Sequence, residues 1–340
     1  NSPFKFLRLT GLLVILMAPS VHAAATYSGL PAPPNLNVQS FIVVDFDTGT
    51  VIAERNADER AEPASLAKIM TSYVAADSLA AGAITLTDTT TVSEKAWRTE
   101  GSRMFIEVNK QVSVDELLQG IIVQSGNDAS VAIAEHISGS EEVFASIMNQ
   151  QAARLGMKDS GFTNSTGLPD PGTYTTARDL ATLAITFIRD FPAIYKRFAE
   201  QEYTYAGIKQ RNRNRLLTRD PSVDGFKTGH TEAAGYCLVS SAERGGMRLI
   251  AVVMGAESDS ARTEASQSLL NYGFRFFETR KIYAAGDVVA SAKVWKGESK
   301  KVDVGVVSDL YVTIPRGQYG NIKAAAELSD SISAPIESGQ

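Results

Sequence analysis

Apolar and polar residues alternate in two widely separated parts of the chain, a pattern typical of β-strands. Near the N-terminus, residues 40–45 and 51–54 show this alternation on either side of a turn expected at residues 47–50. Together these segments predict a β-hairpin. The alternation returns after residue 225 in three further segments, at 225–229, 236–242 and 247–254, with a tight turn expected at Gly245 and Gly246.

The long stretch between these predicted strands repeats its apolar residues with the period of an α-helix. Pro63 precedes an apolar, alanine-rich run and marks a further helix start. Strands at both ends with helices between them favour an α+β fold, in which an antiparallel sheet is closed by the first and last segments and flanked by helices. The helices with clear periodicity are expected at 114–122, 128–137, 141–155, 176–188 and 263–277.

The pattern changes again after residue 279, where short strand-like runs alternate with polar turns. These runs predict a small all-β domain over residues 279–340, and its C-terminal end looks incomplete. The larger domain then covers residues 25–278.

The first residues of the chain resemble an export signal. Lys5 and Arg8 precede an apolar stretch, residues 9–17, that is too short to span a membrane, and small residues suited to cleavage follow it. We therefore expect a signal peptide over residues 1–24.

Composition narrows the possible functions. The chain has 340 residues, of which 44% are hydrophobic, enough for two domains with real cores. Its formal net charge of -5 argues against a nucleic-acid partner. The single cysteine, Cys237, lies in an apolar run and is expected to be a buried strand residue rather than a nucleophile. Potential metal ligands do not cluster at ligand spacing, so neither a metal nor another cofactor is expected.

The first candidate for chemistry is Ser65-Leu66-Ala67-Lys68 at the predicted helix start. Two residues three positions apart share one face of a helix. A serine hydroxyl is a weak nucleophile until a neighbouring base takes its proton. The amine of Lys68 can act as that base if burial and other cations lower its pKa. Taken alone, this spacing also occurs by chance.

Two more motifs follow in the chain. Ser125-Gly126-Asn127 lies in a break before a predicted helix, where an N-cap is the simplest structural interpretation. Lys227-Thr228-Gly229 lies on a predicted strand, where a lysine next to a turn glycine could equally mark a sheet edge. In this order, the three motifs match the serine acyl-transfer signature of Ser-x-x-Lys, Ser-x-Asn and Lys-Thr-Gly. The combination favours a shared catalytic site over three unrelated structural roles.

From about residue 41 onward, the chain resembles the low-molecular-weight penicillin-binding proteins, specifically D-alanyl-D-alanine carboxypeptidases of the penicillin-binding-protein-5 type. The resemblance implies a β-lactamase/transpeptidase-like fold with an additional C-terminal β-domain. It implies peptidoglycan stem peptides as substrates, with removal of the terminal D-alanine, and β-lactam antibiotics as covalent ligands. The matching segments are 63–71, 124–129, 167–170, 176–179, 212–214, 223–231 and 272–278.

The family resemblance also implies catalytic roles. Ser65 would attack the carbonyl between two D-alanines, with Lys68 as general base. Ser125 would pass a proton to the leaving D-alanine, assisted by Lys227. The backbone N–H groups of Ser65 and His230 would form an oxyanion hole.

Substrate-binding residues are implied in the same way. Asn127 would hydrogen-bond the substrate backbone. Thr228 would hold the terminal carboxylate together with Arg213 or Arg262, because a guanidinium fork matches a carboxylate.

Other functions are possible on these motifs. A serine β-lactamase shares all three, but class A enzymes need a glutamate for deacylation, and no glutamate loop is convincingly placed between Asn127 and Lys227. A D,D-endopeptidase of the same family would usually lack the β-domain. A non-catalytic wall-binding or penicillin-sensing module would not need intact motifs. A Ser-His-Asp triad through His230 is disfavoured, since the chain has only three histidines.

The resemblance finally implies a location. Members of this family end in an amphipathic helix on the outer surface of the cytoplasmic membrane, and no basic amphipathic stretch is present up to Gln340. We therefore expect a periplasmic protein that is peripheral to the membrane through a C-terminal segment absent from this sequence.

Overall fold

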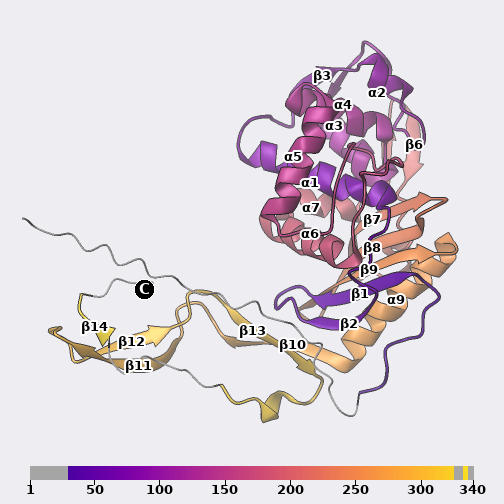
Figure 1. Ribbon diagram of the computed structural model, residues 1–340. Helices are drawn as coiled ribbons and strands as arrows, with labels where there is room; N and C mark the ends of the chain where they lie inside the picture. The colour runs from indigo at the N-terminus through magenta and orange to yellow at the C-terminus, as the bar shows by residue number, and fades with distance from the viewer. Residues whose placement is uncertain (1–29, 325–331, 336–340) are drawn as a thin grey trace, which may run out of the picture.

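A five-stranded antiparallel sheet forms the centre of the larger part of the molecule (Figure 1). The computed structural model describes residues 30–324 and 332–335, so the expected signal peptide at 1–24 lies outside the described residues. The strand order is β2-β1-β9-β8-β7. The strands are β1 (Ser40–Asp45), β2 (Val51–Arg55), β7 (Val223–Thr231), β8 (Gly235–Arg244) and β9 (Met247–Ala256).

The N-terminal hairpin and the C-terminal strands join through β1, as the alternating pattern predicts. Val43 on β1 lies opposite Ala53 on β2 and opposite Ala251 on β9. Every residue of β1 is buried, because this strand has a neighbour on each side and helices on both faces. The sheet therefore joins strands that are far apart in the sequence, as the pairing of residues 43 and 251 shows.

Side chains alternate between two cores on the two faces of the sheet. Ile42 and Val44 join the core beneath the main helices, while Phe41 and Val43 join the core beneath α9. Figure 1 shows α9 on the face opposite α1 and α6. The helices are α1 (Ala67–Ala80), α2 (Glu94–Arg98), α3 (Val114–Gln119), α4 (Asn127–Ser138), α5 (Glu141–Arg154), α6 (Ala177–Asp190), α7 (Pro192–Tyr195), α8 (Leu216–Arg219) and α9 (Asp259–Phe276).

Helix α1 lies inside the helical layer. Its residues 67–76 are all buried, which is the pattern of a helix surrounded by other elements. Residues 64–66 precede it as a short 3-10 turn, η1. Two small hairpins complete this part of the molecule, β3 (Thr89–Thr91) with β4 (Gln111–Ser113) and β5 (Glu202–Tyr205) with β6 (Ile208–Arg211).

Two helix boundaries differ from the sequence prediction by three residues or more, and the others by one or two. The helix expected at 114–122 ends at Gln119 and continues as a five-residue π-helix, η2 (Gly120–Gln124). The helix expected at 263–277 begins four residues earlier, at Asp259, because the Ser258 side chain accepts a hydrogen bond from the Ala261 N–H and caps the first turn.

The C-terminal region contains two small sheets, drawn in yellow tones in Figure 1. Strand β10 pairs with β13, and β11 lies between β12 and β14. The sequence pattern did not single out β10, which starts directly after α9. These strands are β10 (Phe277–Tyr283), β11 (Val288–Trp295), β12 (Lys301–Gly305), β13 (Leu310–Pro315) and β14 (Ile332–Ser333).

A buried carboxylate joins the first of these sheets to the central one. Asp45, at the end of β1, is completely buried. It accepts hydrogen bonds from Thr48 Oγ1 at 2.8 Å and from Thr279 Oγ1 of β10 at 2.6 Å. Thr48 Oγ1 also lies 2.7 Å from Thr313 Oγ1 of β13. Hydrogen bonds to an ionised group are among the stronger ones, so Asp45 fixes this junction.

No helix in the described part of the chain is both long enough and apolar enough to cross a membrane.

Candidate active site

Ser65 and Lys68 form a hydrogen-bonded pair at the start of α1. Ser65 lies on η1 and is partly exposed, whereas Lys68 is only 1% exposed. The Lys68 Nζ donates to Ser65 Oγ at 3.1 Å and to the carbonyl oxygen of Thr166 at 2.6 Å. The sequence-predicted pairing of these two residues is thus present, with the hydroxyl facing solvent and the amine behind it.

The surroundings of Lys68 favour the neutral amine. Burial, reinforced by the positive charge of Arg213, lowers the pKa of Lys68 to about 7, although Asp128 and Glu141 oppose the shift. A neutral amine 3.1 Å from a hydroxyl can accept its proton. This arrangement is suited to activating Ser65 near neutral pH.

Close packing fixes the backbone just before Ser65. Ala64 adopts a left-handed conformation with φ of 48°, which is strained for a residue with a side chain. Gly167 packs directly against it. A Cβ atom at position 167 would lie 1.8 Å from the Ala64 carbonyl oxygen, so only glycine fits there.

Ser125 follows the π-helix η2 and also has a left-handed backbone, with φ of 65°. Such single π-turns and strained residues recur at functional sites. Its hydroxyl is buried and has no hydrogen-bond partner in the described part of the chain. Buried polar atoms normally have partners, so this one is suited to a ligand group.

Asn127 begins α4, but the helix has no side-chain N-cap, so the capping interpretation of this motif is wrong. Its side-chain Nδ2 donates to the Glu100 carbonyl at 2.6 Å, and its backbone N–H donates to Ser102 at 2.7 Å. Asn127 Oδ1 is buried without a partner among the described residues. The side chain is therefore oriented by its amide nitrogen and leaves its oxygen available.

The third motif lies on β7, the edge strand of the sheet. Lys227 is buried, and burial together with the charges of Lys68, Arg213 and Arg262 lowers its pKa well below the usual value. Its Nζ donates to the Thr228 carbonyl at 3.1 Å.

Gly229 permits the close approach of β7 to η1. A Cβ atom there would lie 2.9 Å from the Pro63 carbonyl oxygen and 3.2 Å from Leu66 N. A side chain at this position would separate the strand from the turn that carries Ser65. The glycine of the third motif thus has a steric reason.

All three motifs border one pocket of about 450 Å³. The convergence expected from the sequence is therefore present in the structure. The residues around the pocket are Ser65, Ser102, Ser125, Arg213, Arg215, Thr228, Gly229, His230, Tyr236, Asp259 and Arg262.

The two candidate arginines differ in their environment. Arg262 is 5% exposed, donates to the Gly229 carbonyl at 2.9 Å and forms an ion pair with Asp259. Arg213 is exposed on the loop between β6 and α8, and no carboxylate of the described residues lies within 4 Å of it. Arg262 supports β7 from behind, whereas Arg213 has an unpaired guanidinium at the pocket.

His230 is exposed, and its ring packs against Tyr236 at a tilt of 34°, with centroids 4.0 Å apart. Cys237, on the neighbouring strand, is buried as expected, and burial raises the pKa of its thiol to about 11. A thiol with a raised pKa is mostly protonated at neutral pH and makes a poor nucleophile.

Three supporting residues were not assigned roles from the sequence. Thr166 contributes only a backbone carbonyl, which no side-chain motif can reveal. The Glu141 carboxylate accepts hydrogen bonds from Ser165 N at 3.0 Å and Ser165 Oγ at 2.8 Å, and so fixes the segment that carries Thr166. Asp128 is directly adjacent to the second motif, which is the signal that could have identified it.

Asp128 is completely buried and organises the opposite wall of the site. Its carboxylate accepts hydrogen bonds from the backbone N–H groups of Met104 at 3.0 Å, Phe105 at 2.9 Å and Ile106 at 3.2 Å. This segment directly follows Ser102, which borders the pocket. Asp128 therefore connects the start of α4 to residues 104–106, which we call the loop above Ser125.

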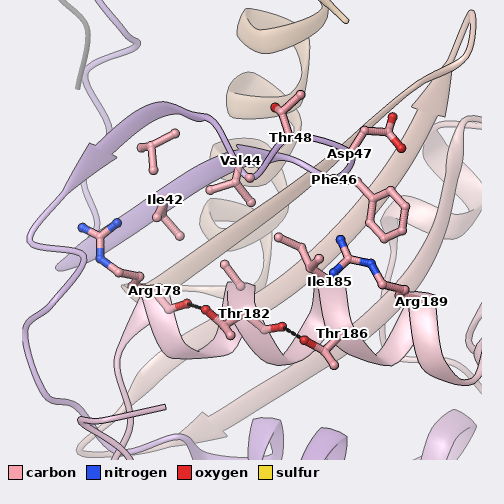
Figure 2. A pocket seen from close by; sticks show the side chains of 13 residues that line it. Ile42, Val44, Phe46, Asp47, Thr48, Arg178, Thr182, Ile185, Thr186 and Arg189 are labelled. Atoms are coloured by element: carbon pink, nitrogen blue, oxygen red, sulfur yellow. Dashed lines mark hydrogen bonds between the residues drawn. The ribbon is translucent and has the colours of Figure 1, made fainter. Parts of the chain in front are cut away.

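A larger hollow of about 580 Å³ lies elsewhere, between α6 and the β1–β2 hairpin (Figure 2). Its floor is apolar, and the hydroxyls of Thr182 and Thr186 donate to carbonyls of their own helix. None of the residues around it pairs a nucleophile with a base, so its size does not make it the active site. Among the described residues, no group of three or more His, Cys, Asp and Glu side chains could hold a metal ion.

Comparison with known protein families gives two matches that together cover most of the chain. Residues 28–258 match the family described as D-alanyl-D-alanine carboxypeptidase. Residues 277–340 match the C-terminal domain of penicillin-binding protein 5.

Individual proteins give the same result. The chain is 42% identical over 346 residues to D-alanyl-D-alanine carboxypeptidase DacA of Escherichia coli K12, an alignment that spans 99% of this chain and 86% of that protein. The crystal structure of penicillin-binding protein 5 from Haemophilus influenzae superposes with a TM-score of 0.88 at 43% identity, covering 91% of this chain and 92% of that one. Penicillin-binding protein D2 from Listeria monocytogenes in its cefotaxime-bound form is 28% identical, with a TM-score of 0.66, over 72% of this chain and 100% of that one.

Proposed function

This chain belongs to the D-alanyl-D-alanine carboxypeptidase family, as a serine enzyme of the penicillin-binding-protein-5 type. We propose that Ser65 is the residue that the substrate acylates. The observation that carries this assignment is the hydrogen bond of 3.1 Å between Ser65 Oγ and the amine of Lys68. That amine is buried and has a pKa lowered to about 7, which makes it a competent proton acceptor.

Acylation proceeds by attack of Ser65 Oγ on the carbonyl carbon between the last two D-alanines, while its proton passes to Lys68. Backbone N–H groups of Ser65 and His230 donate hydrogen bonds to the carbonyl oxygen as negative charge develops on it. Donors of this kind lower the barrier by about 3 to 4 kcal/mol. The C–N bond then breaks, and Ser125, assisted by Lys227, delivers its proton to the departing amine while Lys68 passes the Ser65 proton on to Ser125. Free D-alanine leaves, and an ester on Ser65 remains.

Deacylation uses the same groups in the reverse sense. A water molecule takes the position of the departed amine, and its proton passes through Ser125 to Lys68 as it attacks the ester carbonyl. The bond to Ser65 Oγ breaks, and Lys68 returns that proton to the serine oxygen. The unpartnered Ser125 hydroxyl supports this role, because it is buried beside the pocket and has a free hydrogen-bonding capacity among the described residues.

The substrate lies between the second and third motifs in this proposal. Asn127 Oδ1, which has no partner in the described chain, accepts a hydrogen bond from the substrate backbone. Thr228 and Arg213 bind the terminal carboxylate. Arg213 is preferred over Arg262 because the Arg262 guanidinium is already bonded to the Gly229 carbonyl and to Asp259.

β-Lactam antibiotics react at the same serine. Their strained amide places a carbonyl and a carboxylate at a spacing similar to that of the substrate, so acylation of Ser65 follows the same course.

We propose that residues 1–24 direct export, that residues 25–278 form the catalytic domain, and that residues 279–340 belong to the β-domain. The mature protein then acts in the periplasm, at the surface of the membrane.

Product analysis tests the activity. The enzyme is expected to release D-alanine from a pentapeptide ending in D-Ala-D-Ala and to leave a cross-linked peptide dimer intact. Cleavage of the dimer at a comparable rate would instead identify a D,D-endopeptidase, and rapid turnover of penicillin would identify a β-lactamase.

Mass spectrometry tests the nucleophile. Incubation with penicillin should add one penicilloyl group to a peptide containing Ser65. The Ser65→Ala variant should form no adduct, whereas Ser146→Ala, on the exposed face of α5, should acylate like the parent protein. Normal acylation of Ser65→Ala would show that another residue is the nucleophile.

A further inference from the structure

The end of the β11–β12 hairpin carries an unusual concentration of positive charge. Residues 293–301 contain four lysines and a single acidic residue, Glu298, in a chain whose formal net charge is -5. Trp295 lies among them and is 62% exposed. We define this cluster as the hairpin tip; it consists of Lys293, Trp295, Lys296, Lys300 and Lys301, all exposed.

The strand register places like charges directly opposite one another. Lys293 on β11 is paired with Lys301 on β12. Cross-strand partners point to the same face of a sheet, and like charges in that position destabilise the pair. Trp295, two residues beyond Lys293, points to that face as well. The hairpin itself gains nothing from this arrangement.

Within the described part of the chain, neither the lysines nor the tryptophan have a partner. No carboxylate of the described residues lies within ion-pair distance of the four lysines, whereas Lys281 in the same region pairs with Asp309. The opposite face of the hairpin is apolar and half-buried, through Val294 and Val302. Trp295 therefore contributes no side chain to that apolar face, and its indole ring is left at the surface.

The tip also lies far from the catalytic pocket. Figure 1 shows β11 and β12 at the end of the molecule away from the helical layer, beyond β10 and β13. A role in binding the substrate at Ser65 is therefore excluded by position. The tip is instead placed to contact something outside the protein.

We propose that the hairpin tip binds an anionic phospholipid surface. Tryptophan prefers the boundary between headgroups and acyl chains, because its ring is apolar and its N–H is polar. Lysines are attracted to anionic headgroups, and each one near such a surface strengthens binding by about fivefold. The combination of an exposed indole and unpaired amines on one hairpin matches both layers of that boundary. This inference does not depend on the assignment of Ser65.

Vesicle binding tests the proposal with the mature chain, residues 25–340, because the apolar export segment would itself bind lipid. The probes are vesicles containing phosphatidylglycerol at about one third of the lipid, and neutral phosphatidylcholine vesicles. The chain has two tryptophans, so a Trp97→Phe background makes fluorescence report on Trp295 alone. Binding to the anionic vesicles, with a blue shift of Trp295 emission and weakening by salt, is expected.

Matched variants separate the tip from general charge. Lys293→Gln combined with Lys301→Gln should weaken binding by at least about tenfold, by the contribution expected of each lysine. Lys110→Gln combined with Lys158→Gln removes the same charge from exposed positions far from the tip and should leave binding unchanged. Trp295→Ser should reduce binding to the same vesicles. Release of D-alanine should be equal in all variants, which checks that they are folded.

Three results would overturn the proposal. One is equal affinity for anionic and neutral vesicles, and another is an equal loss of binding in the tip and control variants. The third is binding of polyglutamate as tightly as of vesicles without a blue shift, which would identify an acidic protein as the partner.

Discussion

Gly167 lies so close to Ala64 that a Cβ atom at position 167 would meet the Ala64 carbonyl oxygen at 1.8 Å. Ala64 is itself strained and directly precedes Ser65. The position of the nucleophile is thus set in part by a residue that contributes no side chain.

We expect Gly167→Ala to abolish acylation by penicillin, because the Ala64–Ser65 turn has to move away from Lys68. Gly156→Ala is the matched control. Gly156 has the same φ of 76° but no atom within 4 Å of a Cβ, so its substitution adds only backbone strain of about 1 to 2 kcal/mol. Equal acylation rates of the two variants, measured by stopped-flow, would show that the contact with Ala64 is unimportant.

The second prediction concerns pH. Lys68 accepts a proton only when its amine is neutral, and its pKa is lowered to about 7. The acylation rate constant should therefore be constant above that pKa and fall about tenfold per pH unit below it. Penicillin acylation measured from about pH 5 to 9 tests this expectation, and a flat profile down to pH 5 would contradict it.

The third prediction concerns the free energy of unfolding, which should also depend on the protonation of Lys68. The pKa of Lys68 is lower in the folded protein than its ordinary value of 10.5, so the unfolded chain binds more protons between the two values. This lysine therefore makes the folded state more stable as pH rises from about 7 toward 10.5 and has no further effect below about 7. Chemical denaturation of the parent protein and Lys68→Met across this range isolates its contribution, which should appear as a difference in slope.

The two arginines give a fourth prediction. Arg213→Gln should raise KM for the pentapeptide by about tenfold to a hundredfold, the value of a charged hydrogen bond, and leave Tm unchanged. It should also shift the pH profile to higher pH, because the Arg213 charge helps to lower the pKa of Lys68.

Arg262→Gln should behave differently. It removes the buried donor to the Gly229 carbonyl and leaves Asp259 without that partner, so Tm should fall. An unchanged Tm in Arg262→Gln, together with a raised KM, would reverse the roles of the two residues.

Asp128 gives the fifth prediction. Asp128→Ala leaves the buried N–H groups of residues 104–106 without an acceptor, so the free energy of unfolding should drop by about 3 kcal/mol or more. Acylation should slow as well, because the loop above Ser125 loses its support. Glu107→Gln, an exposed position directly after that segment, serves as the control in urea denaturation. Equal stability of the two variants would show that other contacts hold the loop.

The sequence was sufficient to predict the sheet, its closure and the three motifs. Alternation identified β1 and β2 near the start of the chain and β7 to β9 near its end, and the buried pairing of Val43 with Ala251 confirms how they join. The order of the three motifs predicted that they meet at one pocket, and Ser65, Ser125 and Thr228 do border it.

The features that escaped prediction depend on contacts rather than on pattern. Periodicity cannot distinguish the last turn of an α-helix from a π-helix, so the strained backbone of Ser125 was missed. The Thr166 carbonyl has no side-chain signal at all. Strand β10 was overlooked because its sequence, FETRKIY, is largely polar, as suits a strand in a two-stranded sheet.

The hydrogen bonds that Asp45 accepts have a mechanical consequence. Asp45 terminates β1, and β1 belongs to the same sheet as β7, whose far edge carries Lys227. A force applied to the C-terminal strands is therefore transmitted through Thr279 and Asp45 into the sheet that carries the catalytic pocket. If the C-terminal strands are held in place, the pocket stays at a fixed distance from them, and that distance limits how far the pocket can reach.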